Sequence, residues 1–148
     1  MLTVLLMEWL MAAPLALEGP GVPARAHTLD DVRWEQRVLL LFPGDKPEAW
    51  TEQQEKLEKA RSALDQRDVL VVVVGGDPEA PVRIPDDRAA RERWKVSPGE
   101  ARAVLVGKDG QEKWRATLPA SLKPVFTLID GMPMRQQEMR DRHPKGAD

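Results

Sequence analysis

The residue types that most often carry chemistry are scarce in this 148-residue chain. It contains no cysteine, which excludes disulfides, thiolate nucleophiles, cysteine zinc sites and iron–sulfur clusters within the chain. Its two histidines, His27 and His143, lie far apart, so a histidine-based catalytic triad would require two distant segments to meet. Thiol redox activity is therefore excluded, and the sequence favours a protein that is not an enzyme.

The methionines near the C-terminus are the one arrangement that resembles a metal site. Met132, Met134, Met139 and His143 offer thioether and imidazole ligands, which together suit Cu(I) in an exported protein. Methionine is also a flexible filler of hydrophobic cores, so packing is the simpler interpretation. We expect no cofactor and keep a Cu(I) carrier as an alternative.

The same segment is a candidate structural or functional motif. Pro133 is expected to end the last helix, after which the chain turns back across the domain surface with Met134 packed beneath it. Arg135 and Glu138 are expected to be surface or partly buried ion-pair partners. The residues of the motif are Asp130, Met132, Pro133, Met134, Arg135 and Glu138.

Composition limits the class of protein and its partners. The 24 acidic and 22 basic residues give a formal charge of −2, and no stretch gathers lysine and arginine into a stripe that follows a phosphate backbone. We therefore do not expect a nucleic-acid partner. The length fits one domain with a single hydrophobic core.

Two continuous apolar runs, residues 37–42 and 69–74, predict strands that are covered on both faces. Residues 47–66 between them have apolar side chains at helical spacing, which predicts a surface helix with one buried stripe. The stripe consists of Trp50, Leu57, Ala60 and Leu64. A strand, a helix and a strand in this order predict a parallel pair with a right-handed crossover.

A short helix is expected at residues 88–95, capped by Asp86 or Asp87. Its inward residues are expected to be Ala89, Ala90 and Trp94.

Residues 103–106 and 112–118 flank an Asp109-Gly110 pair, which predicts a hairpin, and alternation in the second strand places it at an edge of the sheet. Lys108 beside the turn is expected to be solvated. A broad apolar face predicts a last helix at residues 122–131. The predicted order is β-α-β-α-β-β-α, an α/β domain with a mixed four-stranded sheet and helices on both faces.

The first 26 residues have the order of a secretory signal. Residues 2–17 are almost wholly apolar, and residues 18–26 break helix and end in Ala-Arg-Ala. Two features depart from such a signal, because Glu8 lies inside the apolar run and no Lys or Arg precedes it. The alternatives are an N-terminal anchor, a buried helix, and a wrongly assigned start codon that leaves out a basic n-region.

Cleavage after Ala26 would leave residues 27–140 as the folded domain and residues 141–148 as a flexible tail. We then expect a periplasmic or secreted protein with no stable membrane span.

Four segments resemble a known family: Arg33-Trp34, the strand at 37–42, the turn at 106–110 and residues 129–139, which contain Met-Pro-Met-Arg. They are similar to uncharacterised exported bacterial proteins, whose domain resembles the thioredoxin/peroxiredoxin-like domain of equarin and of the sushi-repeat matrix proteins. The resemblance covers nearly all of the chain beyond residue 26. It implies a thioredoxin-like fold and no established activity.

The chain departs from redox members of that fold at two places. Where their reactive cysteine would follow the first strand, this sequence has Phe42-Pro43-Gly44-Asp45-Lys46-Pro47. The proline that thioredoxins place in cis before the hairpin is missing, because residues 100–102 read Glu-Ala-Arg.

The resemblance places Asp45 in the loop where thioredoxin-like proteins keep their chemistry. Asp45, Lys46 and Arg102 therefore form a candidate ligand or partner face, although a plain helix-entry loop is the simpler interpretation. An enzyme with a non-thiol site near Asp45 and Arg102 is an alternative. The tryptophans could stack on a ligand, but core packing is the better interpretation for most of them.

The first hypothesis is an exported, non-catalytic interaction module with an unknown envelope or extracellular protein as its partner.

Overall fold

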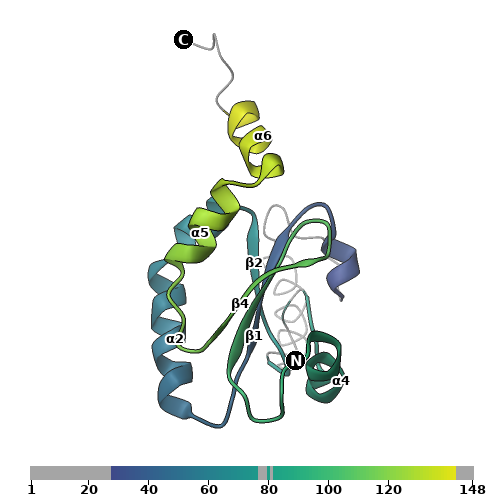
Figure 1. Cartoon of the computed structure of the whole chain (residues 1–148), viewed down its shortest axis with the longest axis vertical. Coiled ribbons are helices and arrows are strands. Elements are labelled where there is room, and N and C mark those ends of the chain that lie inside the picture. The colour runs from purple at the N-terminus through teal and green to yellow at the C-terminus, as the bar shows by residue number, and fades with distance from the viewer. Residues whose placement is uncertain (1–27, 77–79, 81, 143–148) are drawn as a thin grey trace, which may run out of the picture.

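The computed structural model describes residues 28–76, 80 and 82–142 (Figure 1). The predicted leader, His27, His143 and the last residues of the predicted tail lie outside the described residues. Within this part of the chain, no helix combines the length and the apolar character needed to cross a membrane.

The centre of the domain is a mixed four-stranded sheet with the strand order β2-β1-β3-β4. Strands β1 and β2 are parallel, while β1 with β3 and β3 with β4 are antiparallel. The predicted parallel pair, the hairpin and the edge position of β4 are confirmed. The strands are β1 (Arg37–Phe42), β2 (Val69–Val73), β3 (Arg102–Val106) and β4 (Glu112–Thr117).

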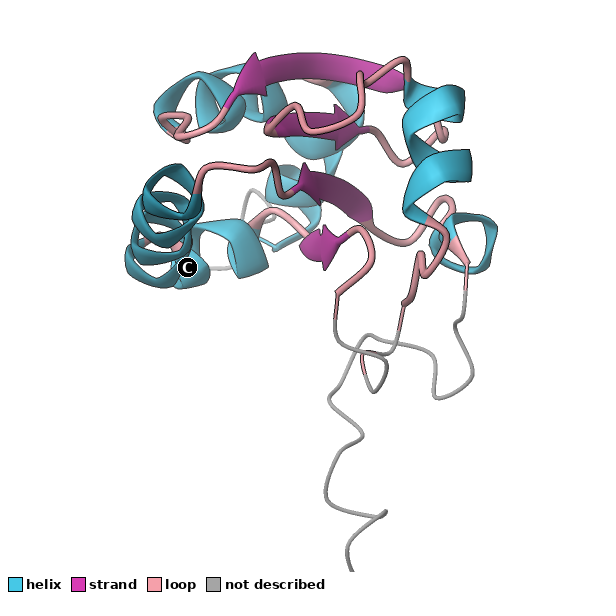
Figure 2. Ribbon diagram, turned by 90° about the horizontal axis from the view of Figure 1, so that it is seen from below, coloured by secondary structure: helices cyan, strands magenta, loops and turns pink. Residues whose placement is uncertain are grey.

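Helices lie on both faces of the sheet, as predicted (Figures 1 and 2). They are the 3₁₀ helix η2 (Leu29–Val32) and the α-helices α2 (Pro47–Lys59), α3 (Arg61–Gln66), α4 (Asp87–Trp94), α5 (Lys123–Asp130) and α6 (Pro133–Arg142). The chain is thus an α/β domain of thioredoxin-like layout with two helices, the short 3₁₀ helix η2 and the α-helix α6, that the sequence did not predict.

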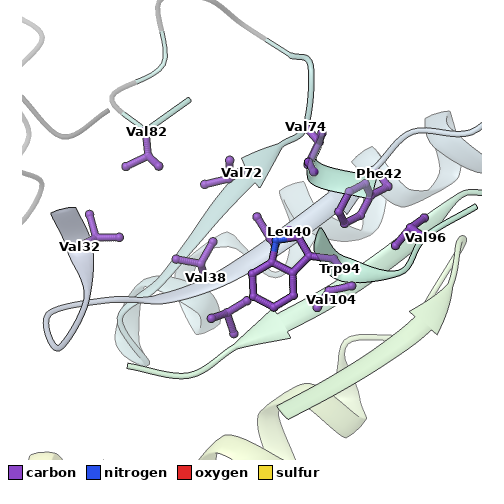
Figure 3. Packing of buried hydrophobic residues seen from close by; sticks show 12 residues of the cluster. Val32, Val38, Leu40, Phe42, Val72, Val74, Val82, Trp94, Val96 and Val104 are labelled. Atoms are coloured by element: carbon purple, nitrogen blue, oxygen red, sulfur yellow. The ribbon is translucent and has the colours of Figure 1, made fainter. Parts of the chain in front are cut away.

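Strand β1 explains the two-sided core, because its side chains alternate between the two faces and all six residues are buried. Leu40 and Phe42 pack on one face with Trp94 of α4, which lies among them in Figure 3. Leu39 and Leu41 pack on the other face, which α2, α3 and α5 cover. Each such side chain contributes about 1.5–3 kcal/mol on burial.

Two predictions of local structure need correction. The predicted helix at 47–66 is broken at Ala60, where φ is −100° and ψ is 4°, so that α2 and α3 are separate. Asp86 caps α4 by accepting a hydrogen bond from the Ala89 N–H at 3.0 Å, but Ala89 itself is exposed. Ala90 and Trp94 face inward as predicted.

The C-terminal segment was also mispredicted in part. Helix α5 ends at Asp130, but the chain does not then turn back across the surface, because Pro133 begins α6. Proline is well tolerated at the first position of a helix, where its missing N–H has no intrahelical partner to lose. Met134 is 42% exposed and does not pack beneath the chain.

Candidate interaction site

The loop after β1 carries Asp45 and Lys46, and both side chains are exposed. The Asp45 N–H donates to the Gly99 carbonyl at 3.3 Å, which joins this loop to the segment before β3. Arg102 is paired with Glu100 at 2.6 Å, and among the described residues no ion pair joins it to Asp45. The structure therefore does not assemble Asp45, Lys46 and Arg102 into one site.

Arg91 of α4 holds this end of the sheet together, and the sequence analysis did not identify it. Its side chain is almost fully buried and lies over the Phe42 ring, with Cζ 5.5 Å from the ring centroid. The guanidinium donates to the Pro43 carbonyl at 2.6 Å and to the Ser97 and Glu100 carbonyls at 2.8 Å. These contacts fix the backbone where redox relatives would carry their reactive thiol.

The C-terminal motif lies at the opposite end of β1. The Glu138 carboxylate of α6 accepts two hydrogen bonds from Arg37, both at 3.2 Å, and one from Lys108 at 2.6 Å. Arg37 is 1% exposed and Lys108 is 8% exposed. The prediction that Lys108 is solvated was wrong, since its ammonium also contacts Asp68 at 3.1 Å.

Asp130 and Arg135 extend this network toward the turn between α3 and β2. The Asp130 carboxylate accepts two hydrogen bonds from Arg67, both at 3.0 Å. Arg135 is buried, donates to the Gln66 carbonyl at 2.9 Å and lies 3.7 Å from Asp130 and Glu138. Arg135 and Glu138 are thus ion-pair partners, as predicted.

Electrostatics favour the ionised form of both motif carboxylates. Burial raises the pKa of Glu138, but the hydrogen bonds from Lys108 and Arg37 lower it further than burial raises it, so the pKa lies below its ordinary value. The hydrogen bonds from Arg67 lower the pKa of Asp130. Both carboxylates therefore act as anions that hold the C-terminal segment to the domain.

Two of the candidate copper ligands share one cleft. Met132 and Met134 line a cleft of about 190 Å³ together with Pro133 and Lys108. Met132 also packs against the core cluster on the α5 side of the sheet. Met139 is not among the residues that line this cleft, and His143 lies outside the described residues.

Trp34 lies at the same end of the sheet as α6 and is the largest exception to the expected core packing. It is 59% exposed and has a φ of 72°, a left-handed conformation that is uncommon for a residue with a side chain. Its N–H donates to the Lys108 carbonyl at 2.7 Å, and the Arg33 guanidinium lies 5.5 Å from the ring centroid. Trp50 and Trp114 pack against the core, as expected.

The residues that the sequence analysis missed at this end left only weak signals. Arg37 opens a strand that is otherwise wholly apolar, and Lys108 follows the buried run of β3 by two positions. A charged side chain next to a fully buried strand needs a partner of opposite charge. The sequence could therefore have predicted that Arg37 and Lys108 form ion pairs. Nothing local indicated that the partner would be Glu138.

The fold and its charged ends define a class of protein, a thioredoxin-like α/β domain whose chain has no cysteine to carry thiol chemistry. The chain belongs to the family described as "Domain of unknown function (DUF4174)", whose sequence pattern matches residues 28–138.

A curated relative agrees with this assignment at low identity. Human Sushi repeat-containing protein SRPX2 is 25% identical over 141 residues, which are 89% of this chain and 30% of that protein. The chain thus spans less than a third of the length of this relative, and the similarity concerns one part of a longer protein.

Solved structures resemble the fold. Reduced 2-Cys peroxiredoxin of Plasmodium vivax gives a TM-score of 0.57 at 16% identity and covers 75% of this chain and 84% of that chain. Thioredoxin peroxidase I of Plasmodium yoelii gives 0.56 at 16% identity and covers 78% and 80%. At these identities the likeness shows the fold alone.

Proposed function

We propose that the chain is an exported, non-catalytic interaction module that binds an envelope or extracellular protein through the end of the sheet that carries Trp34. We call Arg33, Trp34 and residues 109–111 of the hairpin turn the Trp34 surface. The proposed periplasmic or secreted location depends on the leader-like order of residues 1–26.

The observation that carries this proposal is the display of Trp34. Leaving a large apolar ring 59% exposed forgoes much of the free energy that burying it would contribute. The left-handed backbone at φ 72° costs about 1–2 kcal/mol for a residue with a Cβ atom. The described fold gains no core packing from either feature, which favours a role in binding.

The chemistry of the surface suits a protein partner. Tryptophan and arginine are enriched among the residues that dominate protein interfaces, and here Arg33 lies over the Trp34 ring. The hydrogen bond from Trp34 to Lys108 fixes the backbone of this surface before any partner arrives, which lowers the entropic cost of binding. The Asp45 loop offers no comparable feature, because its exposed side chains, Asp45 and Lys46, are polar and Arg102 is paired with Glu100 instead of joining them.

Partner capture in the native host tests the proposal. The full chain with a C-terminal affinity tag is expressed in its own organism and recovered from envelope and medium fractions. We expect the wild type to retain a specific protein and Trp34→Ala to retain at least about tenfold less, a loss typical of an interface hot spot. N-terminal sequencing of the recovered chain tests export, with His27 expected first.

The matched control is Leu128→Ala, which removes a second exposed apolar side chain, 38% exposed, from α5. It should leave capture unchanged. Equal retention by Trp34→Ala and the wild type would overturn the assignment of the surface, and the absence of any retained protein would overturn the interaction function.

A further inference from the structure

Helix α6 is attached to the domain in an unusual way. Its one buried residue is a charged one, Arg135, while Met134 is 42% exposed and Met139 is only half-buried. Short helices in proteins are normally stabilised by an apolar face packed on the core. Charged and polar contacts therefore carry most of the attachment of α6.

The two cations that bind Glu138 belong to the body of the domain and not to α6. Arg37 lies at the start of β1 and donates to the Arg67 carbonyl at 2.9 Å. Lys108 follows β3 and is held by Asp68 at 3.1 Å. Both cations thus keep their positions through contacts that do not involve Glu138. The two hydrogen bonds that the Arg37 guanidinium donates to Glu138 match the planar geometry of a carboxylate.

The network at this end also has more positive than negative charge. Five cationic side chains contact three carboxylates among the described residues. The cations are Arg37, Arg67, Lys108, Arg135 and Arg142, and the carboxylates are Asp68, Asp130 and Glu138. When α6 moves away, Arg135, Arg142 and Glu138 leave with it, and three cations remain with the carboxylates of Asp68 and Asp130. Arg37 and Lys108 then lose the carboxylate that they share, and the net positive charge that stays behind favours a replacement anion.

We propose that Arg37 and Lys108 form a carboxylate-binding site that Glu138 fills within this chain, and that an acidic segment of the partner protein takes the same site when α6 moves away. The inference rests on the proposed interaction function and adds the chemistry of the partner. The site adjoins the Trp34 surface, because the Lys108 carbonyl accepts the Trp34 N–H while its ammonium binds Glu138.

Chemical rescue tests whether the site accepts a carboxylate from outside. Glu138→Ala in the full chain removes a CH2–COO− group, whose carboxylate a small external anion, propionate, can replace. About 50 mM propionate is expected to raise the melting temperature of this variant on the order of 4 °C, and to leave the wild type unchanged. Propionamide and sodium chloride at equal concentration should give no such shift.

Further variants test whether Lys108 binds the propionate, and they provide a substitute if Glu138→Ala does not fold. Adding Lys108→Met to Glu138→Ala should abolish the propionate shift, whereas adding Lys59→Met, which alters an exposed lysine of α2, should retain it. If Glu138→Ala does not fold, Glu138→Gln is used with the same anions. A shift no larger than that with chloride overturns the site, and a larger shift with phosphate overturns its preference for carboxylates.

Competition in the wild-type chain tests the second half of the inference. Poly-L-glutamate serves as the acidic segment, and hydrogen exchange of the amides of residues 137–142 reports the release of α6. Exchange of these amides should rise at least about threefold, and Lys108→Met should suppress the polymer's effect. Unchanged exchange overturns competition by a partner segment. Since no partner is needed here, these tests and the capture experiment can fail independently.

Discussion

The two ends of the central sheet are held together by different kinds of contact. At the Phe42 end, Arg91 donates to backbone carbonyls, two of which lie only 6 and 9 positions further along the chain. At the Arg37 end, Glu138 reaches back 101 positions to pair with a cation. At the Phe42 end most partners of Arg91 are peptide carbonyls, and its one ion pair is with the exposed Asp87 at 3.0 Å. At the Arg37 end most contacts are ion pairs, beside hydrogen bonds from Arg37 and Arg135 to peptide carbonyls.

This difference separates a fixed end from an adjustable one. Peptide carbonyls do not titrate in the accessible range, and a buried guanidinium that contacts three of them has no simple replacement. Carboxylates can be protonated, screened or exchanged for another carboxylate. The end where redox relatives keep their thiol is therefore the static part of this molecule, and the end with Trp34 and α6 is the part suited to binding.

The largest expected change in stability comes from removing the Arg91 side chain at the fixed end. Arg91→Ala leaves the Pro43, Ser97 and Glu100 carbonyls without their buried donor and should lower the free energy of unfolding by about 3 kcal/mol. Urea denaturation measures it. Arg88→Ala is the control, because that side chain is 91% exposed on the same helix and should change stability by less than about 0.5 kcal/mol. Equal effects would mean that Arg91 does not organise this end.

The fold was largely predictable because its signals are local. Continuous apolar runs gave β1 and β2, and the Asp109-Gly110 turn gave the hairpin. The break at Ala60 has no glycine or proline to mark it. Helix α6 was missed because Pro133 was interpreted as the end of a helix, although it stands at the first position of the next one.

The candidate site was predictable only in part. The motif residues Asp130, Arg135 and Glu138 were identified, but their partners depend on which distant segments the fold brings together. Exposure of Trp34 is likewise set by tertiary structure, since its neighbours along the chain resemble those of many buried tryptophans. The sequence thus predicted the C-terminal half of the network, and it missed the partners Arg37 and Lys108 and the exposure of Trp34.

Acid should weaken the contacts that hold α6 at the adjustable end before it unfolds the core. The pKa values of Glu138 and Asp130 lie below their ordinary values of 4.5 and 3.8, so the stability that they contribute is present above those values and is lost as pH falls through the lowered ones. As the pH falls below these ordinary values, α6 should detach while the core stays folded. Methyl NMR of Met139 reports α6, and the methyls of Val104 report the core.

Two results would decide this prediction. Glu138→Gln should remove most of the pH dependence of the Met139 signal, because it replaces the titrating carboxylate with a neutral amide. If Met139 and Val104 change together at a single midpoint, α6 does not detach separately and the contrast between the two ends fails.

The smallest expected change in stability concerns Trp34, and it tests whether its backbone conformation is retained for binding. At φ 72° a glycine has no Cβ atom to strain, whereas an alanine keeps that strain and lacks the ring. The free energy of unfolding of Trp34→Gly should therefore be about 0.5–1 kcal/mol larger than that of Trp34→Ala. We expect this order even though glycine is more flexible in the unfolded chain. Both variants should lose the partner equally. A glycine variant that is less stable than the alanine variant would show that the left-handed backbone is not strained, and the argument that Trp34 is displayed at a structural cost would then rest on its exposure alone.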